Sequence, residues 1–432
     1  MDWADTPEQA AFRREVRDFI RERFPQGYPP DLEAEQSVEP EDIPGYNWPA
    51  DRISDDPVRR AAAQEWGAAL AERGWVAPHW PREYGGGGLG VLEQFIYNEE
   101  MANARVPMVG GIGVSLIGPT LIVYGSAEQK SEHLPRILSG EVAWAQGFSE
   151  PGAGSDLAAL ATRADRDGDT YVINGQKIWT SGAQYADWMC ALVRTDPHAE
   201  TKHRGITFLI FDTETRGISV RPLTDMTGQE PFNEAFFEDV RVPASQRVGE
   251  ENRGWYVAMA MLDFERSGIG GAVGYRKALE DLIEVVGRCA SDDGAGGRSA
   301  GDGGAEERGD ASAAVRSDWR NTVRLEMSDR FIETEVLHNF ALRTVSMQAH
   351  EVIPNYEASV NKLFGSEVHQ ALARTGTKAF GLYGGIWDRA TAPLDAFFVR
   401  DYVGSVAHTV FSGSSEIQRN VIATRGLGLP RG

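Results

Sequence analysis

The 432-residue sequence is poor in cysteine, lacks a long apolar run and carries fewer basic than acidic side chains. Its two cysteines, Cys190 and Cys289, are too few for a disulfide framework or a CxxC metal site. Cys190 lies within the apolar run WMCALV, so we expect it to be a small buried residue. No stretch approaches the roughly 18 apolar residues of a membrane span, and the N-terminal stretch lacks the features of a signal peptide. These absences predict a soluble, cytoplasmic protein that does not enter a membrane.

Acidic side chains outnumber basic ones by 64 to 43, which gives a formal net charge of −21. Nucleic-acid binding requires lysine and arginine to neutralise phosphates, so this excess argues against a nucleic-acid partner. The chain is longer than one hydrophobic core usually serves, and its 41% hydrophobic content is typical of globular proteins. We therefore expect two or three packed units.

The N-terminal part carries clear helix signals. Thr6 precedes Pro7, and Gln9 stands three residues after the threonine, which is the pattern of a capped helix start. Residues 25–57 are rich in proline and acids and predict an irregular connection, after which an Ala-rich helix begins at Pro57.

The spacing of apolar residues changes twice along the chain. Short β-rich runs occupy the middle, and helical spacing returns from Asn252 onward. We predict an α+β protein with an N-terminal helical domain (1–141), a central β-domain (142–250) and a C-terminal helical domain (251–432). Gly, Ala, Ser and acids without apolar periodicity predict a flexible insert at about 291–314.

Residues 143–181 hold the strongest functional signal. The segment SEPGAGSD predicts a loop whose backbone N–H groups form a concavity suited to an anionic or polar ligand. Asn174-Gly175 predicts a type I′ hairpin turn, which would place Trp179, Thr180 and Ser181 on the returning strand. Donors beside a flat ring indicate a site for a planar, polar cofactor. The alternatives are a loop that only connects two elements and a tryptophan that belongs to the core.

Together these two segments resemble the signature of the acyl-CoA dehydrogenase family, which runs from EPGAGSD to a strand with a WxT-like end. The segment APHWPREYGGGG is a weaker match to the same family. The resemblance implies a β-domain between two helical domains, a homotetramer or dimer, and FAD as cofactor. It also implies oxidation of an acyl-CoA to the trans-2-enoyl-CoA in fatty acid β-oxidation, with an electron-transferring flavoprotein as electron acceptor.

The resemblance also indicates where the catalytic base lies. In many members the base is the glutamate of a YEGT segment, and here Ser412 takes that position. In other members it lies in a segment like LDLERLVLA, which Leu262–Arg266 matches with Glu265 at the base. Burial would raise the pKa of such a carboxylate toward that of the substrate's α-proton. The alternative is that Glu265 pairs with a surface Lys or Arg on an ordinary helix.

The family's binding residues transfer only to matched positions. For the substrate, the resemblance assigns Ser155 to the pantetheine arm, and Asp263 and Arg266, which flank the base, to substrate binding. For FAD, it assigns nine positions: Gln146, Phe148, Ser149, Gly154, Ser155, Trp179, Ser181, Ser414 and Glu416.

The sequence departs from the family in one further place. The RxxFG segment that reaches the FAD diphosphate is replaced by a region with Arg288 but no FG. Glycines at 110, 111, 113 and 118 suggest volume for a bulky or branched acyl group, or else mark helix breaks. Two other functions stay open: a flavin-dependent monooxygenase of the same fold, and a non-catalytic partner subunit of a heteromeric dehydrogenase.

Overall fold

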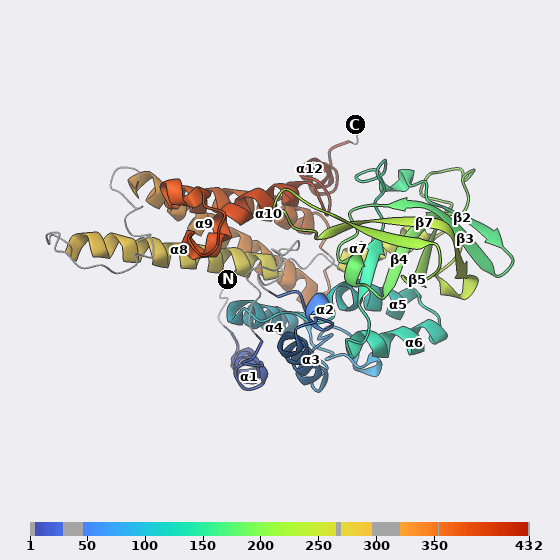
Figure 1. Cartoon of the computed structure of the whole chain (residues 1–432), viewed down its shortest axis with the longest axis horizontal. Helices are drawn as coiled ribbons and strands as arrows, with labels where there is room; N and C mark the ends of the chain where they lie inside the picture. Colours follow the sequence, from blue (N-terminus) through green and yellow to red (C-terminus); the bar gives the residue numbers. More distant parts are fainter. Residues whose placement is uncertain (1–4, 29–45, 265–268, 296–319, 353, 431–432) are drawn as a thin grey trace. The chain divides into compact units, whose positions relative to one another are not determined.

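The computed structural model describes residues 5–28, 46–264, 269–295, 320–352 and 354–430 (Figure 1). The chain divides into two compact units, Met1–Ser267 and Gly268–Gly432. Among the described residues, no helix combines the length and the apolarity needed to cross a bilayer.

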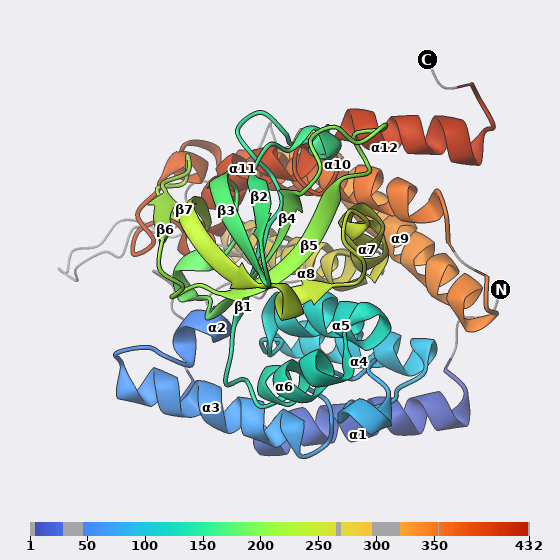
Figure 2. The same cartoon turned by 90° about the vertical axis from the view of Figure 1, so that its right-hand side faces the viewer.

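The first unit begins with helices whose starts the sequence specifies. On α1, the Thr6 hydroxyl accepts from the Gln9 N–H at 3.2 Å, and the Gln9 side chain accepts from the Thr6 N–H at 2.8 Å, which confirms the predicted capping box. Helix α3 begins at Pro57 as predicted, whereas the irregular connection before it contains the short helix α2. Figure 2 shows α1 and α3–α6 on one side of the sheet. The helices are α1 (Pro7–Arg23), α2 (Trp48–Asp51), α3 (Pro57–Ala71), α4 (Val91–Ala104), α5 (Gly118–Tyr124) and α6 (Ala127–Leu138).

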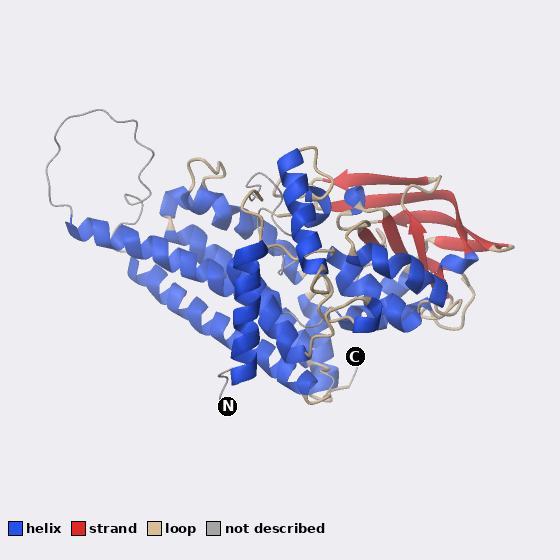
Figure 3. Cartoon of the chain, turned by 90° about the horizontal axis from the view of Figure 1, so that it is seen from below, coloured by secondary structure: helices blue, strands red, loops and turns tan. Residues whose placement is uncertain are grey.

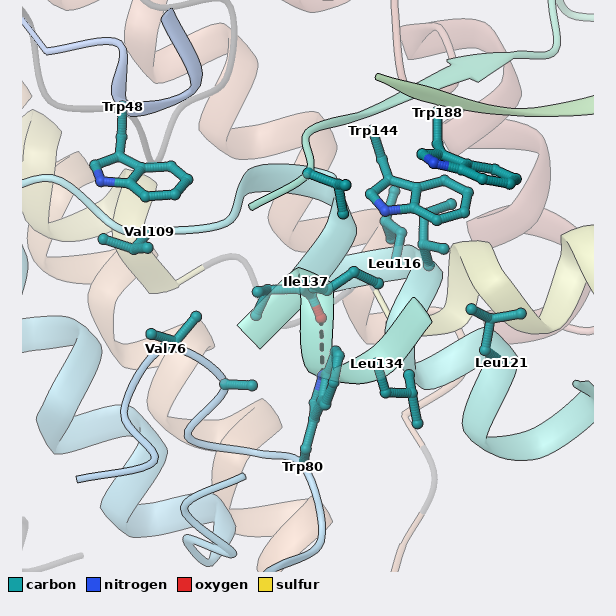
Figure 4. Close-up of a cluster of buried hydrophobic side chains, with 14 of the residues drawn as sticks. Trp48, Val76, Trp80, Val109, Leu116, Leu121, Leu134, Ile137, Trp144 and Trp188 are labelled. Carbon is teal, nitrogen blue, oxygen red and sulfur yellow. Dashed lines mark hydrogen bonds between the residues drawn. The ribbon is translucent and has the colours of Figure 1, made fainter. Parts of the chain in front are cut away.

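A tryptophan-rich core joins these helices to the sheet. Trp80 is buried and donates its indole N–H to the Val114 carbonyl at 3.0 Å (Figure 4). Trp144 and Trp188, from two neighbouring strands, belong to the same cluster. The Trp80 indole N–H is satisfied in this way, whereas the buried Trp144 N–H has no partner among the described residues. The cluster buries large apolar ring surfaces.

The described strands form one sheet in the order β6-β7-β3-β2-β4-β5-β8, with β1 pairing parallel to β4. All lie within the predicted β-rich part, and Cys190 on β4 is fully buried as expected. Figure 3 shows the strands, in red, gathered in this sheet. The strands are β1 (Trp144–Gly147), β2 (Arg163–Asp167), β3 (Thr170–Lys177), β4 (Trp188–Arg194), β5 (Ile206–Asp212), β6 (Ile218–Leu223), β7 (Phe232–Pro243) and β8 (Arg247–Val248).

The predicted hairpin turn at Asn174-Gly175 is wrong. Strand β3 runs through both residues, and the turn between β2 and β3 lies at 168–169. The dipeptide instead forms a β-bulge, because the pairing with β7 shifts register there. Gly175 has φ +152°, and a Cβ on it would lie 2.7 Å from the Thr162 Cα. Glycine is therefore required here because the backbone of Thr162 approaches closely, and not because the chain turns.

The second unit is a helical bundle, as predicted. Helix α10 packs against α8, α9 and α11, and the core holds Leu279, Leu372, Phe380 and Phe398. Residues 291–295 are helical and 296–314 lie outside the described residues, so the flexible insert stays a prediction. The bundle helices are α8 (Ile269–Ala295), α9 (Arg320–Ala349), α10 (Glu357–Ala379), α11 (Phe397–Gly404) and α12 (Ser415–Val421), while α7 (Gly254–Phe264) belongs to the first unit.

Candidate functional site

The Gly-rich segment leaves β1 and forms an open loop. Phe148 is buried against Phe208, whereas Gly154 and Ser155 are exposed. A Cβ at Gly152 or Gly154 would meet nothing within 4 Å. The predicted loop is confirmed, and its glycines keep one side of the backbone open to a ligand.

A buried ion pair closes the base of this loop. Glu150 accepts from the backbone N–H groups of Ala161 at 2.6 Å and Thr162 at 2.9 Å. Its Oε1 also lies 2.7 Å from Nζ of Lys177, the last residue of β3, and that amine donates to the Phe148 carbonyl at 3.1 Å. One carboxylate thus holds the two ends of the loop together and ties them to β3.

The pKa values of both partners are shifted by their surroundings. Burial opposes ionisation of Glu150, but the Lys177 charge and the hydrogen bonds to the carboxylate bring the pKa of Glu150 below its ordinary value. Burial lowers the pKa of Lys177 to about 8, against the raising effect of Glu150. Neither residue was recognised from the sequence. The sequence feature that could have indicated Lys177 is its spacing. It lies an even number of residues after Tyr171 and Ile173 in β3, which is the spacing of residues that share one face of a strand, and all three are buried.

The segment after β3 presents an aromatic ring to solvent. Trp179 is 58% exposed, has φ +60° and meets Phe232 edge to face. The core interpretation of this ring is therefore wrong, and so is its placement on a returning strand, because β3 ends at Lys177. A left-handed non-glycine residue is unusual and often marks a functional site.

Asn233, at the start of β7, is hydrogen-bonded to the segment that carries Trp179 and Thr180. Its carbonyl accepts from the Thr180 N–H at 3.1 Å, and its side-chain amide donates to the Thr180 carbonyl at 3.0 Å. Asn233 is fully buried. Sequence reasoning missed this contact as well, since an asparagine in a strand carries no motif of its own.

Three polar side-chain atoms near these segments have no hydrogen-bond partner among the described residues. They are Nε2 of Gln146, on β1, Oγ1 of the fully buried Thr180, and Oδ1 of Asn233. A buried polar group without a partner costs about 1–3 kcal/mol. Such atoms fit a site whose ligand supplies polar partners, and FAD, with its carbonyls and ring nitrogens, has that chemistry.

In the second unit, the expected cofactor residues lie at the start of α12. Ser414 caps the helix by accepting from the Ile417 N–H at 3.4 Å, and Ser412 has φ +50°. Glu416 is exposed, and its pKa is lowered by its own backbone N–H and by the Ser414 hydroxyl. The N-cap of α12 is thus Ser414, and the cofactor contact of both residues stays a prediction.

Three models of known protein domains match the chain, all from acyl-CoA dehydrogenases. They are the N-terminal domain at residues 51–141, the middle domain at 145–240 and the C-terminal domain at 320–427. The chain belongs to the acyl-CoA dehydrogenase family. It is therefore an FAD-dependent acyl-CoA oxidoreductase with the family fold, in agreement with the resemblance in its sequence.

Curated relatives and solved structures extend this likeness over the whole chain. Acyl-CoA dehydrogenase IpdE1 of Mycobacterium tuberculosis is 36% identical over 85% of this chain and 88% of its own. Acyl-CoA dehydrogenase FadE26 of the same organism is 34% identical over 99% and 98%. A structure described as "Tcur3481-Tcur3483 steroid ACAD" superposes with a TM-score of 0.79 at 31% identity, covering both chains fully. The ChsE4-ChsE5 complex from Mycobacterium tuberculosis gives 0.78 at 33%, also over both whole chains.

The predicted base of this acyl-CoA dehydrogenase lies outside the described residues. Helix α7 ends at Phe264, and Glu265 and Arg266 follow directly. The backbone of Asp263 belongs to α7, but its side chain lies outside what the structure describes. The roles of all three residues stay predictions.

The expected acyl volume beside the glycines is wrong for most of them. A Cβ at Gly118 would lie 1.7 Å from a ring atom of Trp80, and one at Gly113 would lie 3.1 Å from Trp144. At Gly110 the same atom would meet Val114 at 2.3 Å. These glycines make room for neighbouring core side chains, so they leave no space for a substrate.

Proposed function

We propose that this acyl-CoA dehydrogenase oxidises its thioester to the trans-2-enoyl-CoA, with Glu265 removing the α-proton. The proposal is carried by the open Gly-rich loop and the exposed Trp179, joined at their base and flanked by the unpartnered polar atoms of Gln146 and Thr180. FAD, when bound, would supply the ring that accepts the β-hydrogen with its electron pair. The residues proposed to hold it in the first unit are Gln146, Phe148, Ser149, Gly154, Ser155, Trp179 and Ser181.

The base assignment has a direct test. Ser412 offers a hydroxyl, which does not take up the α-proton at neutral pH without a partner base, whereas a carboxylate whose pKa is raised by burial does so. Glu265→Gln should keep bound FAD but lose bleaching of the flavin by acyl-CoA under anaerobic conditions. Glu284→Gln is the control, because its carboxylate is exposed on α8 and pairs with Arg288 at 3.4 Å. Turnover retained by Glu265→Gln would place the base elsewhere.

We propose a polycyclic acyl-CoA as the substrate class. The support is the likeness, over the whole length of both chains, to the structure described as a steroid ACAD. Stopped-flow reduction of the flavin by short linear, branched and polycyclic acyl-CoAs ranks the three classes in one preparation. We expect the polycyclic thioester to give the highest ratio of rate to dissociation constant. A strict preference for short linear chains would reject the proposal.

We further propose that the chain assembles with a second acyl-CoA dehydrogenase-like chain, in place of the homotetramer or dimer expected from the family, and passes electrons to an electron-transferring flavoprotein. The support is that the structural relatives include the ChsE4-ChsE5 complex, and that Ser412 and the missing RxxFG leave this chain with an incomplete family pattern. The assembly is tested by light scattering and by the FAD content per chain. Both are measured on this chain alone and after its co-expression with a second acyl-CoA dehydrogenase-like chain. An active homotetramer with one FAD per chain would contradict a heteromer. The cytoplasmic location stays a prediction.

A further inference from the structure

Lys177 is a fully buried cation that lies next to the candidate site without entering it. Its side chain is 0% exposed, and its contacts are the Glu150 carboxylate at 2.7 Å and the Phe148 carbonyl at 3.1 Å. Burying an ammonium group is expensive unless it is paired and hydrogen-bonded. A strand-end lysine in water would serve the fold at no such cost, so its burial calls for a reason.

The stem of Lys177 is packed closely by β1. A Cβ on Gly147, at the end of β1, would lie at an ordinary contact distance of 3.5 Å from Cγ of Lys177 and more tightly, at 3.0 Å, against Sδ of Met189. Across the pair, the Thr162 hydroxyl donates to the Gln176 carbonyl at 3.3 Å. The loop base and the end of β3 are thus held by several contacts that surround one charge pair.

The pair lies at the junction of the two segments proposed to bind the cofactor. Phe148 and Glu150 begin the Gly-rich loop, and Lys177 stands two residues before Trp179. The backbone N–H of Ile178 donates to the Ser149 carbonyl at 3.0 Å, which joins the same two segments directly. A shift of Lys177 therefore changes the distance between the loop and the aromatic segment.

We propose that Lys177 is a positioning residue for the bound flavin: through Glu150 it sets the separation of the Gly-rich loop from the Trp179–Ser181 segment. The inference rests on the proposed placement of FAD between these segments. Lys177 itself touches neither substrate nor cofactor. A preorganised site loses affinity when the groups that orient its ligand contacts are removed, even though those groups lie behind the contact surface.

The test compares a buried pair with an exposed one on the same loop. Lys177→Met keeps the stem length and removes the charge. The control is Lys202→Met, because Lys202 pairs with Asp156 of the loop at 2.6 Å with both side chains in solvent. FAD is titrated into the flavin-depleted full-length chain, and the visible circular dichroism of the bound flavin is recorded. We expect the dissociation constant for FAD to rise about tenfold or more in Lys177→Met, with a changed dichroism spectrum, and to stay within about twofold in Lys202→Met.

A second variant guards against loss of folding. Lys177→Met leaves Glu150 as a buried acid with one partner fewer, whereas Lys177→Met with Glu150→Gln removes both charges and should fold more readily. We expect the same weakened FAD binding in the double variant. If the folded double variant binds FAD with the wild-type constant and spectrum, Lys177 supports the fold alone and the inference is overturned. Failure of the wild-type chain to bind FAD would count against the proposed function instead.

Discussion

The two regions expected to contact the cofactor are held in place in opposite ways. In the first unit, the Gly-rich loop is closed by the buried pair Lys177–Glu150, whose partners lie 27 residues apart in sequence. In the second unit, the segment before α12 is held by local contacts near the surface: Ser414 caps the helix, and Gln418 donates to the Ser412 and Gly413 carbonyls at 3.1 and 3.3 Å. The first region depends on tertiary packing of charge, and the second on hydrogen bonds within one short stretch.

The largest expected effect comes from breaking the buried pair. Lys177→Met should lower the free energy of unfolding by about 3–5 kcal/mol, because it leaves a carboxylate buried beside a missing cation. Urea unfolding of the purified chain measures the change. Lys202→Met, which breaks the exposed pair with Asp156, should lower the free energy of unfolding by less than about 1 kcal/mol. Equal losses in the two variants would remove the distinction between buried and exposed pairs on this loop.

Next in size is the glycine of the bulge in β3. Gly175→Ala should cost about 1–3 kcal/mol, because the new Cβ would meet the Thr162 backbone and side chain at 2.6–2.9 Å in a backbone conformation that only glycine adopts easily. The matched control is Gly168→Ala in the neighbouring turn, where φ is +61° and a Cβ meets nothing within 4 Å. Thermal unfolding of both variants separates the clash from the backbone cost. If Gly168→Ala lowers the melting temperature more than Gly175→Ala does, the clash with Thr162 is not the main cost at Gly175.

The buried pair also predicts a dependence of stability on alkaline pH. Lys177 has a pKa of about 8 in the folded chain and an ordinary value of 10.5, so between these values the unfolded chain binds a proton that the folded chain does not. The free energy of unfolding should therefore rise with pH in this window, by about 1.4 kcal/mol per pH unit at most. Glu150 and Arg194 are the charged groups that act on Lys177. The measurement is the difference between wild type and Lys177→Met at about pH 8 and about pH 9.5, and a constant difference would contradict the buried, partly neutral amine.

The smallest effect is expected at the helix cap of the second unit. Ser414→Ala removes the acceptor for the Ile417 N–H and should cost about 1 kcal/mol. Thr6→Ala on α1 is a matched control, since it removes the same kind of cap at 3.2 Å. Denaturant midpoints of the two variants should shift by similar amounts. A loss at Ser414 as large as that at Lys177 would mean that this segment is not held locally.

Local rules predicted much of the fold. The capping box of α1, the start of α3 at Pro57 and the burial of Cys190 all follow from short patterns and are confirmed. The turn at Asn174-Gly175 failed because the same dipeptide suits a bulge, and only the approach of Thr162 decides between the two. The glycines at 113 and 118 failed as signs of open volume because their neighbours, Trp144 and Trp80, are distant in sequence.

Only some of the residues of the candidate site could be predicted from the sequence. The Gly-rich loop and Trp179 belong to a recognisable motif, whereas Lys177 and Asn233 carry no motif and act through contacts that form on folding. A lysine at the end of a strand is usually exposed, and nothing local indicates that a glutamate 27 residues earlier has been buried to meet it. Sequence patterns therefore identified the surface expected to contact the ligand more readily than the residues behind it.

The exposure of Trp179 has an optical consequence. The other tryptophans that the structure describes are buried or half-buried, so of these rings Trp179 should contribute most to the red edge of the intrinsic emission. A flavin lying against it would absorb that emission and quench it. The decay of the long-wavelength fluorescence is then a label-free record of how fast the cofactor arrives, built into the native chain.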